Sequence, residues 1–263
     1  MTDDDIALAH ALADAAGAAI RPWFRRPFLV ETKEDFSPVT IADREAEAAI
    51  RALLAIHRPH DGVIGEEYGD DRPDAARVWV LDPIDGTRAF VAGRPIFGTL
   101  IALMEDGVPA LGLIDQCIIG DRWVGAAGRP TLFNGHPAHV RRCGTIGAAH
   151  VGTTSPHAFD PADFAAFCRV QAAARDTLYG GDCHNYGLVA SGHLDMVIEA
   201  SLKIHDWAAL VPVVTGAGGV MTDWAGAPLH RGSDGRVVAA GDARVAEAAR
   251  AVLTAASARS NNR

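Results

Sequence analysis

An apolar run meets two carboxylates within one short segment of this chain, Val78-Trp79-Val80-Leu81-Asp82-Pro83-Ile84-Asp85-Gly86-Thr87. The β-branched and aromatic residues of the run favour a strand. Pro83 stiffens the turn that follows, and Gly86 leaves the backbone free to begin a helix. Because Asp82 and Asp85 lie three residues apart on this turn, both side chains can face one point. The segment therefore predicts a strand, a turn and a helix around an acidic centre.

The turn also offers groups that suit metal ions and phosphate. Beside the two carboxylates it presents the Ile84 carbonyl, and the backbone N–H groups of Gly86 and Thr87 at the helix start suit a phosphate oxygen. Mg²⁺ prefers oxygen ligands and keeps several waters, so a few carboxylates and a substrate phosphate can complete its coordination. In the competing interpretation, Asp82 and Asp85 merely cap the following helix, as aspartates often do at such turns. The turn alone leaves both interpretations open.

Acidic groups next to two other predicted elements favour metal binding. Glu66 follows the predicted strand 62–64, and Asp206 lies in Ile204-His205-Asp206-Trp207 before another apolar helix. Charges at separate strand ends have no evident structural reason, whereas converging carboxylates would hold hard cations. The sequence has no His or Cys cluster with zinc-type spacing. Together these residues predict a magnesium site built of carboxylates.

Composition fits a globular protein that binds neither nucleic acid nor membranes. The chain has 263 residues, of which 49% are hydrophobic, enough for a substantial core. Its 24 basic and 33 acidic residues give a formal charge of -9, the wrong sign for neutralising nucleic-acid phosphates. Four widely spaced cysteines and an acidic start without a secretory leader predict a cytoplasmic protein with reduced thiols. The longest uncharged stretch, 207–222, is shorter than the roughly 20 apolar residues that a bilayer requires, so no membrane span is expected.

The order of patterns predicts one unit with a mixed fold. Helical spacing appears over 3–24 and 43–57, and a polar loop or hairpin is expected between them at 31–40. The runs that predict a largely antiparallel sheet are 62–64, 78–81, 96–103, 110–114 and 122–125. Beyond about residue 148 strands and helices alternate, with helices expected at 158–172, 184–192, 205–217 and 242–257. We expect a single unit, 1–263, with an α+β half over 1–130, an α/β half over 131–263 and the site at their junction.

These motifs resemble the inositol monophosphatase superfamily, whose members carry GEE, a hydrophobic strand running into DPIDGTxxF, and later WDxAA with AGG. The corresponding segments here are Gly65-Glu66-Glu67, Trp79 to Phe90, His205 to Ala209 and Ala217-Gly218-Gly219. The resemblance covers most of the chain and implies a fold of the α+β / α/β class, a layered αβαβα sandwich. It also implies a homodimeric phosphatase of small phosphate esters with two or three Mg²⁺ ions per active site. Two positions depart from the family pattern: His205 stands where Trp is usual, and Gly216 where an acidic residue is common.

The resemblance implies roles for residues at matching positions. The implied metal ligands are Glu66, Asp82, the Ile84 carbonyl, Asp85 and Asp206. The implied catalytic residues are Thr87, which is supported by Asp43 and orients the attacking water, together with Glu66 and the nearby Glu67. Because a metal-activated water needs neither a covalent nucleophile nor an imidazole base, His205 is expected either to be structural or to lie behind the metal ligands and support them. Asp43 directly precedes the predicted helical run and could also be its N-cap.

Within the superfamily the chain looks most like the histidinol-phosphate phosphatase subgroup, and the segments that carry this likeness are 93–103, 112–116, 180–186 and 194–199. Histidinol phosphate has an ammonium and an imidazole that should meet carboxylates, whereas an inositol ring needs mainly neutral hydrogen-bond partners. Asp182 stands where inositol phosphatases usually have a small residue, and Glu199 ends an apolar strand, so we expect this pair at the cationic end of the substrate. A solvated turn acid is the alternative for Asp182. The predicted substrate contacts are Asp85, Gly86, Thr87, Asp182, Asn185, Glu199 and Asp206.

Two other functions are compatible with the motifs. An inositol-1-phosphate or 3'-phosphonucleotide phosphatase of the same superfamily would share the chemistry but not the substrate end. A non-catalytic ligand-binding homologue would keep the fold, but it would have no reason to keep the complete set Glu66, Asp82, Asp85, Thr87 and Asp206. Of the remaining polar residues, His184 is expected at the surface or as a cap, and Arg94 could meet phosphate or be an ordinary loop arginine.

Overall fold

The computed structural model describes residues 1–32 and 38–255. Its helices are α1 (Asp3–Ile20), α2 (Ile41–His57), α3 (Thr87–Val91), α4 (Pro161–Ala173), α5 (Cys183–Ala190), α6 (Ile204–Trp207), α7 (Leu210–Gly216) and α8 (Ala243–Thr254), with 3-10 turns η1 (Ile146–Ala148) and η2 (Pro156–Ala158). Its strands are β1 (Val30–Thr32), β2 (Pro38–Thr40), β3 (Gly62–Gly65), β4 (Gly69–Asp71), β5 (Arg77–Asp85), β6 (Gly98–Glu105), β7 (Val108–Gln116), β8 (Asp121–Ala126), β9 (Leu132–Phe133), β10 (His136–Pro137), β11 (His150–Thr153), β12 (Asp176–Tyr179), β13 (Met196–Glu199), β14 (Val220–Thr222) and β15 (Val237–Ala240).

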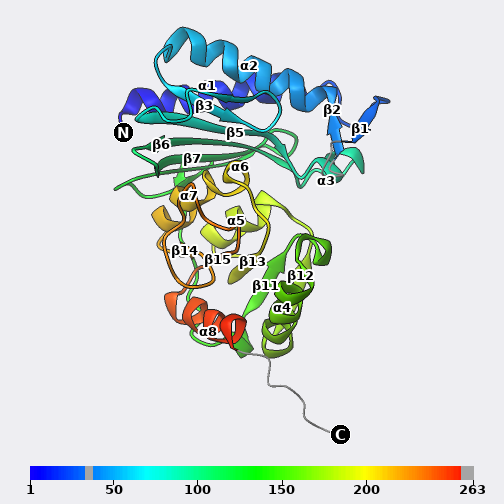
Figure 1. Ribbon diagram of the computed structural model, residues 1–263, viewed down its shortest axis with the longest axis vertical. Helices are drawn as coiled ribbons and strands as arrows, with labels where there is room; N and C mark the ends of the chain where they lie inside the picture. Colours follow the sequence, from blue (N-terminus) through cyan, green and yellow to red (C-terminus); the bar gives the residue numbers. More distant parts are fainter. Residues whose placement is uncertain (33–37, 256–263) are drawn as a thin grey trace, which may run out of the picture.

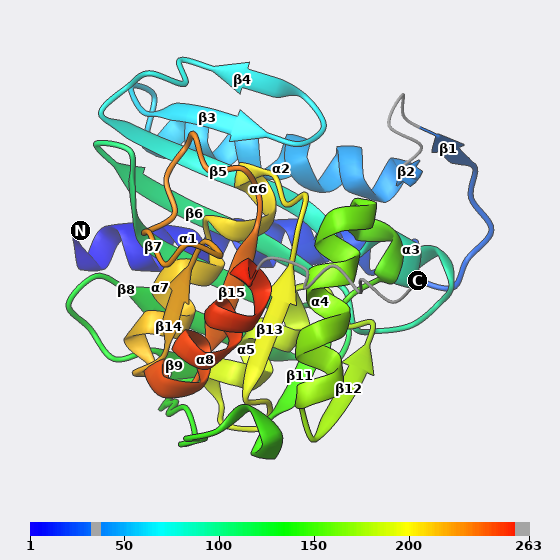
Figure 2. The same ribbon diagram turned by 60° about the horizontal axis from the view of Figure 1, so that its bottom comes forward.

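Helices and sheets alternate in five layers (Figure 1). Helices α1 and α2 cover the outer face of an eight-stranded sheet with the strand order β10-β9-β8-β7-β6-β5-β3-β4. Helices α5, α6 and α7 lie between this sheet and a five-stranded sheet with the order β12-β11-β13-β15-β14. Helices α4 and α8 cover the far face of the second sheet, and these two helices lie in front of that sheet in Figure 2. The αβαβα sandwich implied by the resemblance is therefore confirmed.

The apolar run before the acidic turn forms a strand that is buried on both faces. Trp79 and Leu81 pack into the core beneath α1 and α2, while Val78 and Val80 pack into the core that contains α5 and α7. The run is continuous rather than alternating because helices cover the sheet on either side. The eight-stranded sheet is antiparallel except between β3 and β5. That parallel pair places Gly65 beside Leu81, so Glu66, which follows β3, and Asp82 in β5 lie at the same end of the paired strands.

Prolines account for two differences from the expected helices. Helix α1 ends at Ile20 rather than near residue 24, because Pro22 has no N–H to continue the hydrogen-bond ladder. The helix expected over 205–217 is divided into α6 and α7. Pro212 has no N–H with which to bond the Ala208 carbonyl, so the ladder is interrupted there. As a result Asp206 lies on its own short helix.

The predicted loop or hairpin at 31–40 has the arms of a hairpin, since β1 and β2 pair in antiparallel register. Its residues 33–37 lie outside the described ones. Along the chain, the last strand of the first sheet is β10 and the first strand of the second sheet is β11. The division of the chain into two halves at residue 130 stays a prediction. Within 1–32 and 38–255, no helix is long and apolar enough to cross a membrane.

Candidate active site

The acidic turn lies at the end of β5, where the strand leaves its regular pairing. The register between β5 and β6 shifts between Asp82 and Asp85, so the strand is irregular at the turn. The Ile84 N–H donates to Asp82 Oδ1 at 3.1 Å, and the Thr99 hydroxyl donates to the Pro83 carbonyl at 2.8 Å. These bonds hold the turn rigidly against β6. The capping interpretation is not favoured, because the N-cap of α3 is Gly86 and no side chain caps that helix.

The structure brings the predicted ligands together in two overlapping groups. Asp82, Asp85 and Asp206 each offer a carboxylate oxygen, and these atoms lie within 4.8 Å of one another. Glu66, Asp82 and His205 offer a second set of ligand atoms within the same limit. Asp82 belongs to both groups, so it lies between two positions where an ion could bind. Asp82 and Asp85 lie in β5, His205 and Asp206 lie in α6, and Glu66 directly follows β3. Strand β5 pairs with β3 and contacts α6, which lies against the sheet (Figure 1).

Burial and mutual repulsion make these carboxylates costly without a cation. Burial raises the pKa of Asp82 well above its usual range, and the neighbouring Glu66, Asp85 and Asp206 raise it further. Burial likewise raises the pKa of Asp85, with Asp182 and Asp206 adding to the effect. The pKa of Asp206 is also raised by burial. Divalent cations would relieve this repulsion while using oxygen donors of the type that Mg²⁺ prefers, so the residues fit a metal centre.

Short backbone contacts fix Asp206. Its Oδ2 accepts from the Lys203 N–H at 2.6 Å, at the start of α6. Its Oδ1 lies 3.6 Å from His205 Nε2, too far for a direct hydrogen bond. The buried Trp207 anchors the short helix in the core. Asp206 is thereby turned toward the end of β5.

The hydroxyl of Thr87 lies between two acceptors. Its Oγ1 is 3.1 Å from the Ile84 carbonyl and 3.3 Å from Asp43 Oδ1. The other oxygen of Asp43 accepts from both the N–H and the hydroxyl of Thr40, at 2.8 and 2.6 Å. The interpretation of Asp43 as an N-cap is wrong: α2 begins at Ile41, its N-cap is Thr40, and Asp43 completes the capping box. Asp43 thus joins the helix start to Thr87.

Sequence analysis missed Glu47, which shapes the loop carrying Glu66. Its carboxylate accepts from the N–H groups of Glu67 and Tyr68, at 2.7 and 3.2 Å, and pairs with Arg51 at 2.7 Å. A Cβ at residue 65 would come within 2.0 Å of Glu47 Oε1, which explains the glycine there. The signal was present in the sequence, because Glu47 lies on the buried face of α2 next to Ala46. A carboxylate in that position needs partners.

Asp182 and Glu199 lie near the carboxylate cluster. Together with Asp85 and Asp206 they line a cavity of about 150 Å³. Asp182 also lines a larger adjoining pocket of about 560 Å³, which includes Thr87, Arg88 and Arg94. Burial raises the pKa of Asp182 to about 6, although Arg94 and Arg88 act to lower it. The solvated-acid alternative for Asp182 is therefore not favoured.

Backbone geometry and hydrogen bonds position these two carboxylates. Asp182 has a φ of +46°, a conformation that non-glycine residues adopt at some cost. The Asn185 amide donates to the Gly180 carbonyl at 2.9 Å and so supports the turn that carries Asp182; a direct contact of Asn185 with substrate stays a prediction. Glu199 accepts from the Tyr186 hydroxyl at 2.8 Å and from the Thr154 N–H at 2.9 Å, two partners that sequence analysis missed.

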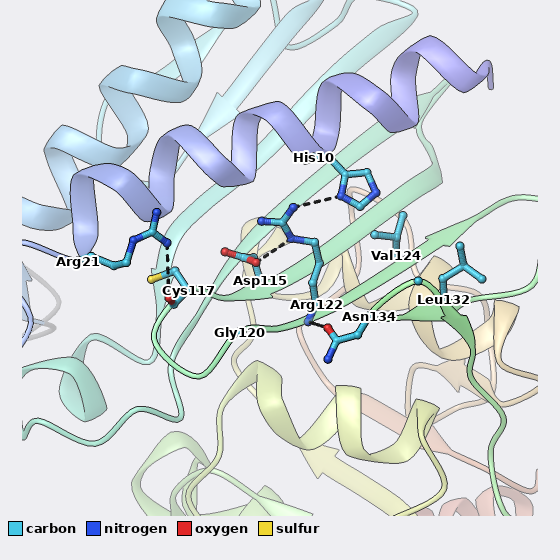
Figure 3. Close-up of a pocket in the computed structure, with 10 residues that line it drawn as sticks. His10, Arg21, Asp115, Cys117, Gly120, Arg122, Val124, Leu132 and Asn134 are labelled. Atoms are coloured by element: carbon cyan, nitrogen blue, oxygen red, sulfur yellow. Dashed lines mark hydrogen bonds and ion pairs between the residues drawn. The ribbon is translucent and has the colours of Figure 1, made fainter.

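The protein has another pocket, of about 370 Å³, between α1 and the strands β7 to β9 (Figure 3). Its polar groups bind one another. Arg122 pairs with Asp115 and Asp14, each at 2.7 Å, and lies 3.1 Å from His10 Nδ1. None of its lining residues belongs to the carboxylate cluster.

The chain belongs to the inositol monophosphatase family, whose model matches residues 1–261. Over 222 residues it is 49% identical to the Arabidopsis thaliana protein named bifunctional phosphatase IMPL2, chloroplastic, a match that covers 84% of this chain and 64% of the plant protein. It thus spans less than two thirds of that relative. Over 244 residues it is 38% identical to the histidinol-phosphatase of Mycobacterium tuberculosis, covering 89% of this chain and 93% of that one. A solved structure of an inositol monophosphatase from Zymomonas mobilis has a TM-score of 0.89 and 53% identity, covering 95% and 98%.

Membership confirms the family that the motifs predicted and the coarse activity, a phosphatase. Enzymes of this family depend on metal ions, typically Mg²⁺, which agrees with the acidic cluster.

Proposed function

We propose that this chain is a Mg²⁺-dependent phosphatase that hydrolyses histidinol phosphate to histidinol and phosphate. The observation that carries the proposal is one cavity that is lined by Asp182 and Glu199 together with Asp85 and Asp206. A substrate whose phosphate meets the metal cluster would therefore place its organic end beside two carboxylates. The likeness to the Mycobacterium tuberculosis histidinol-phosphatase supports the same substrate.

The proposed metal ligands are Glu66, Asp82, the Ile84 carbonyl, Asp85 and Asp206, which would hold two or three Mg²⁺ ions. Bound ions in such a site lower the pKa of a coordinated water and stabilise the charge that develops on phosphate oxygens. The backbone N–H groups of Gly86 and Thr87 would bind a further phosphate oxygen. Direct attack by water leaves no covalent intermediate on the chain.

Thr87 would orient the attacking water. Its single hydroxyl proton goes to Asp43 or to the Ile84 carbonyl, both within 3.3 Å, so its lone pairs can accept from a water. Asp43 is itself held by Thr40, which prevents the pair from rotating. Glu66 follows β3 at the edge of the metal cluster, and Glu67 is held beside it through its N–H on Glu47. We propose that Glu66 and Glu67 are both catalytic residues, together with Thr87 and Asp43.

The cationic end of the substrate would bind Asp182 and Glu199. The ammonium of the substrate would form charge-assisted hydrogen bonds with one of these carboxylates, and the imidazole can donate to the other carboxylate. A neutral inositol ring would leave two acidic groups without compensating charge, which disfavours it. Inositol 1-phosphate nevertheless remains the second candidate, because the Zymomonas mobilis neighbour is described as an inositol monophosphatase.

Phosphate release from a substrate panel tests this proposal. Purified protein would be given histidinol phosphate, inositol 1-phosphate and a 3'-phosphonucleotide in Mg²⁺ buffer, and we expect the highest kcat/KM with histidinol phosphate. Equal or faster turnover of inositol 1-phosphate would exclude the proposed substrate. Asp85→Asn and Asp206→Asn should each nearly abolish hydrolysis of every ester, with circular dichroism unchanged. An absence of turnover with all three esters would favour a non-catalytic ligand-binding homologue. The proposed homodimer can be checked on the same sample by light scattering.

A further inference from the structure

His205 lies in the metal cluster, although the metal chemistry of a magnesium phosphatase needs no imidazole. One of its ring nitrogens is within 4.8 Å of the ligand oxygens of Glu66 and Asp82. Its side chain is 11% exposed, so it is neither free in solvent nor sealed in the core. The position is occupied by Trp in the usual family motif, and Trp offers no metal ligand. The substitution therefore adds a nitrogen donor to an acidic site.

The two overlapping groups differ in the chemistry of their donors. Asp82, Asp85 and Asp206 form an all-oxygen group, which suits Mg²⁺. Glu66, Asp82 and His205 form a mixed nitrogen and oxygen group, and imidazole favours transition metals over Mg²⁺. Because Asp82 is common to both, the two positions are neighbours with different metal preferences.

The contacts of His205 favour ligation over a purely structural role. Its Nε2 is 3.6 Å from Asp206 Oδ1, longer than a hydrogen bond, so this neighbour does not fix the ring. His205 and Glu66 also line a pocket of about 520 Å³ that excludes Asp85 and Asp206. This pocket therefore opens onto two of the three residues of the mixed group, whereas the third, Asp82, is buried.

We propose that His205 is a nitrogen ligand in a metal position formed with Glu66 and Asp82, and that this position binds Mn²⁺ or Co²⁺ in preference to Mg²⁺. The inference rests on the proposed function, because it assumes that the cluster is a metal centre. The neighbouring position formed by Asp82, Asp85 and Asp206 keeps the ordinary preference for Mg²⁺. The enzyme would thus hold two chemically different ions.

Mn²⁺ binding to substrate-free, tag-free protein tests this inference without measuring activity. Calorimetric titration gives the affinities, and pulsed EPR of the bound Mn²⁺ detects coupling to a ligand ¹⁴N nucleus. We expect a ¹⁴N coupling in the wild-type protein that disappears in His205→Gln and in His205→Trp. The Mn²⁺ affinity should fall about tenfold in both variants, while the Mg²⁺ affinity changes much less. The matched control is His193→Ala, an exposed histidine outside the cluster, which should keep both the coupling and the affinity.

The outcomes separate this inference from the proposed function. Mn²⁺ that binds the wild-type protein without a ¹⁴N coupling, or with the same coupling in His205→Gln, would overturn the role of His205 and leave the metal centre intact. Failure of Mn²⁺ and Mg²⁺ to bind the wild-type protein would overturn the proposed function itself. Two variants are used because one could fail to fold, and circular dichroism shows which of them is folded.

Discussion

The carboxylate of Asp182 lies against the backbone of Gly86, so closely that a Cβ at residue 86 would come within 2.8 Å of Asp182 Oδ2. Gly86 also has a φ of +91°, which L side chains rarely adopt. Gly86→Ala would therefore strain the turn and displace Asp182 from the substrate cavity. We expect kcat/KM for histidinol phosphate, measured by phosphate release, to fall about 100-fold.

Gly107→Ala separates these two effects. Gly107 has a φ of +78°, but nothing lies within 4 Å of its would-be Cβ. This variant has the same backbone strain without the clash, so it should lose about 1 kcal/mol of stability and keep its kcat/KM. Equal kcat/KM in Gly86→Ala and Gly107→Ala would show that the contact between Gly86 and Asp182 does not contribute to activity.

Removing the Asp182 carboxylate should change specificity more than catalysis. We expect Asp182→Ala to lower kcat/KM for histidinol phosphate about tenfold or more, the value of one charge-assisted hydrogen bond. A neutral phosphate ester should be affected much less. Asp4→Ala, which removes the same charge from an exposed position on α1, is the matched control. A uniform loss across substrates would be evidence against a cation-binding role.

Tyr186→Phe should move the pH dependence of substrate binding. Burial raises the pKa of Glu199 to about 7, while hydrogen bonds from Thr154 and Tyr186 act to lower it. Loss of the Tyr186 hydroxyl raises the pKa of Glu199 further, so a smaller fraction of Glu199 is ionised at neutral pH. The affinity for a cationic substrate then falls. The acid limb of kcat/KM for histidinol phosphate should therefore shift to higher pH, with most activity recovered at pH 8.5. An unshifted limb would mean that Glu199 does not bind the cationic end.

The acidic turn could be predicted from the sequence because its determinants are local. The apolar run, Pro83, Gly86 and the spacing of the aspartates lie within one segment, so the strand and the acidic turn follow from residue types alone. The assignment of the aspartates as metal ligands stays a prediction. The five-layer sandwich came instead from the likeness of several motifs to a family. The ends of helices were predicted less accurately. Because Thr40 was taken as part of a polar loop, the predicted start of α2 was two residues too late and Asp43 was wrongly interpreted as its N-cap.

Relationships between distant segments were not predictable in this way. Glu47 and Glu67 come from different parts of the chain, and the pairing of β3 with β5 and the packing of α2 on β5 bring them together. Tyr186 on α5 reaches Glu199 at the end of β13, the strand of the second sheet against which α5 packs. His205 was not expected to be a ligand, because a metal-activated water needs no imidazole, and nothing in the sequence shows how near it lies to Glu66. Each of these contacts depends on the register of elements far apart in the chain.

Removing charge from the metal cluster should stabilise the metal-free protein. The pKa of Asp82 in the folded state is well above its unfolded value, so the folded protein binds more protons and loses stability as the pH rises through that window. In chelator at pH 8, Asp82→Asn should therefore raise Tm by about 2–6 °C, because Asn keeps the acceptor for the Ile84 N–H and removes the repulsion. Mg²⁺ should raise Tm of the wild-type protein but not of the variant. A variant that is less stable than the wild type in chelator at pH 8 would contradict this electrostatic account.

Glu47→Gln should weaken metal binding without touching a metal ligand. Glu47 accepts from the N–H groups of Glu67 and Tyr68 and pairs with Arg51, so it fixes the loop that presents Glu66. An amide has one acceptor oxygen instead of two and no charge, which would free one loop N–H and break the ion pair. We expect the Mg²⁺ concentration for half-maximal activity to rise about tenfold, with a smaller change in KM for the ester. The same substitution at the exposed Glu247 of α8 should leave the Mg²⁺ dependence unchanged. If folded Glu47→Gln keeps the wild-type Mg²⁺ dependence, the loop must be held by other contacts, and Gly65 would then be required only for its size.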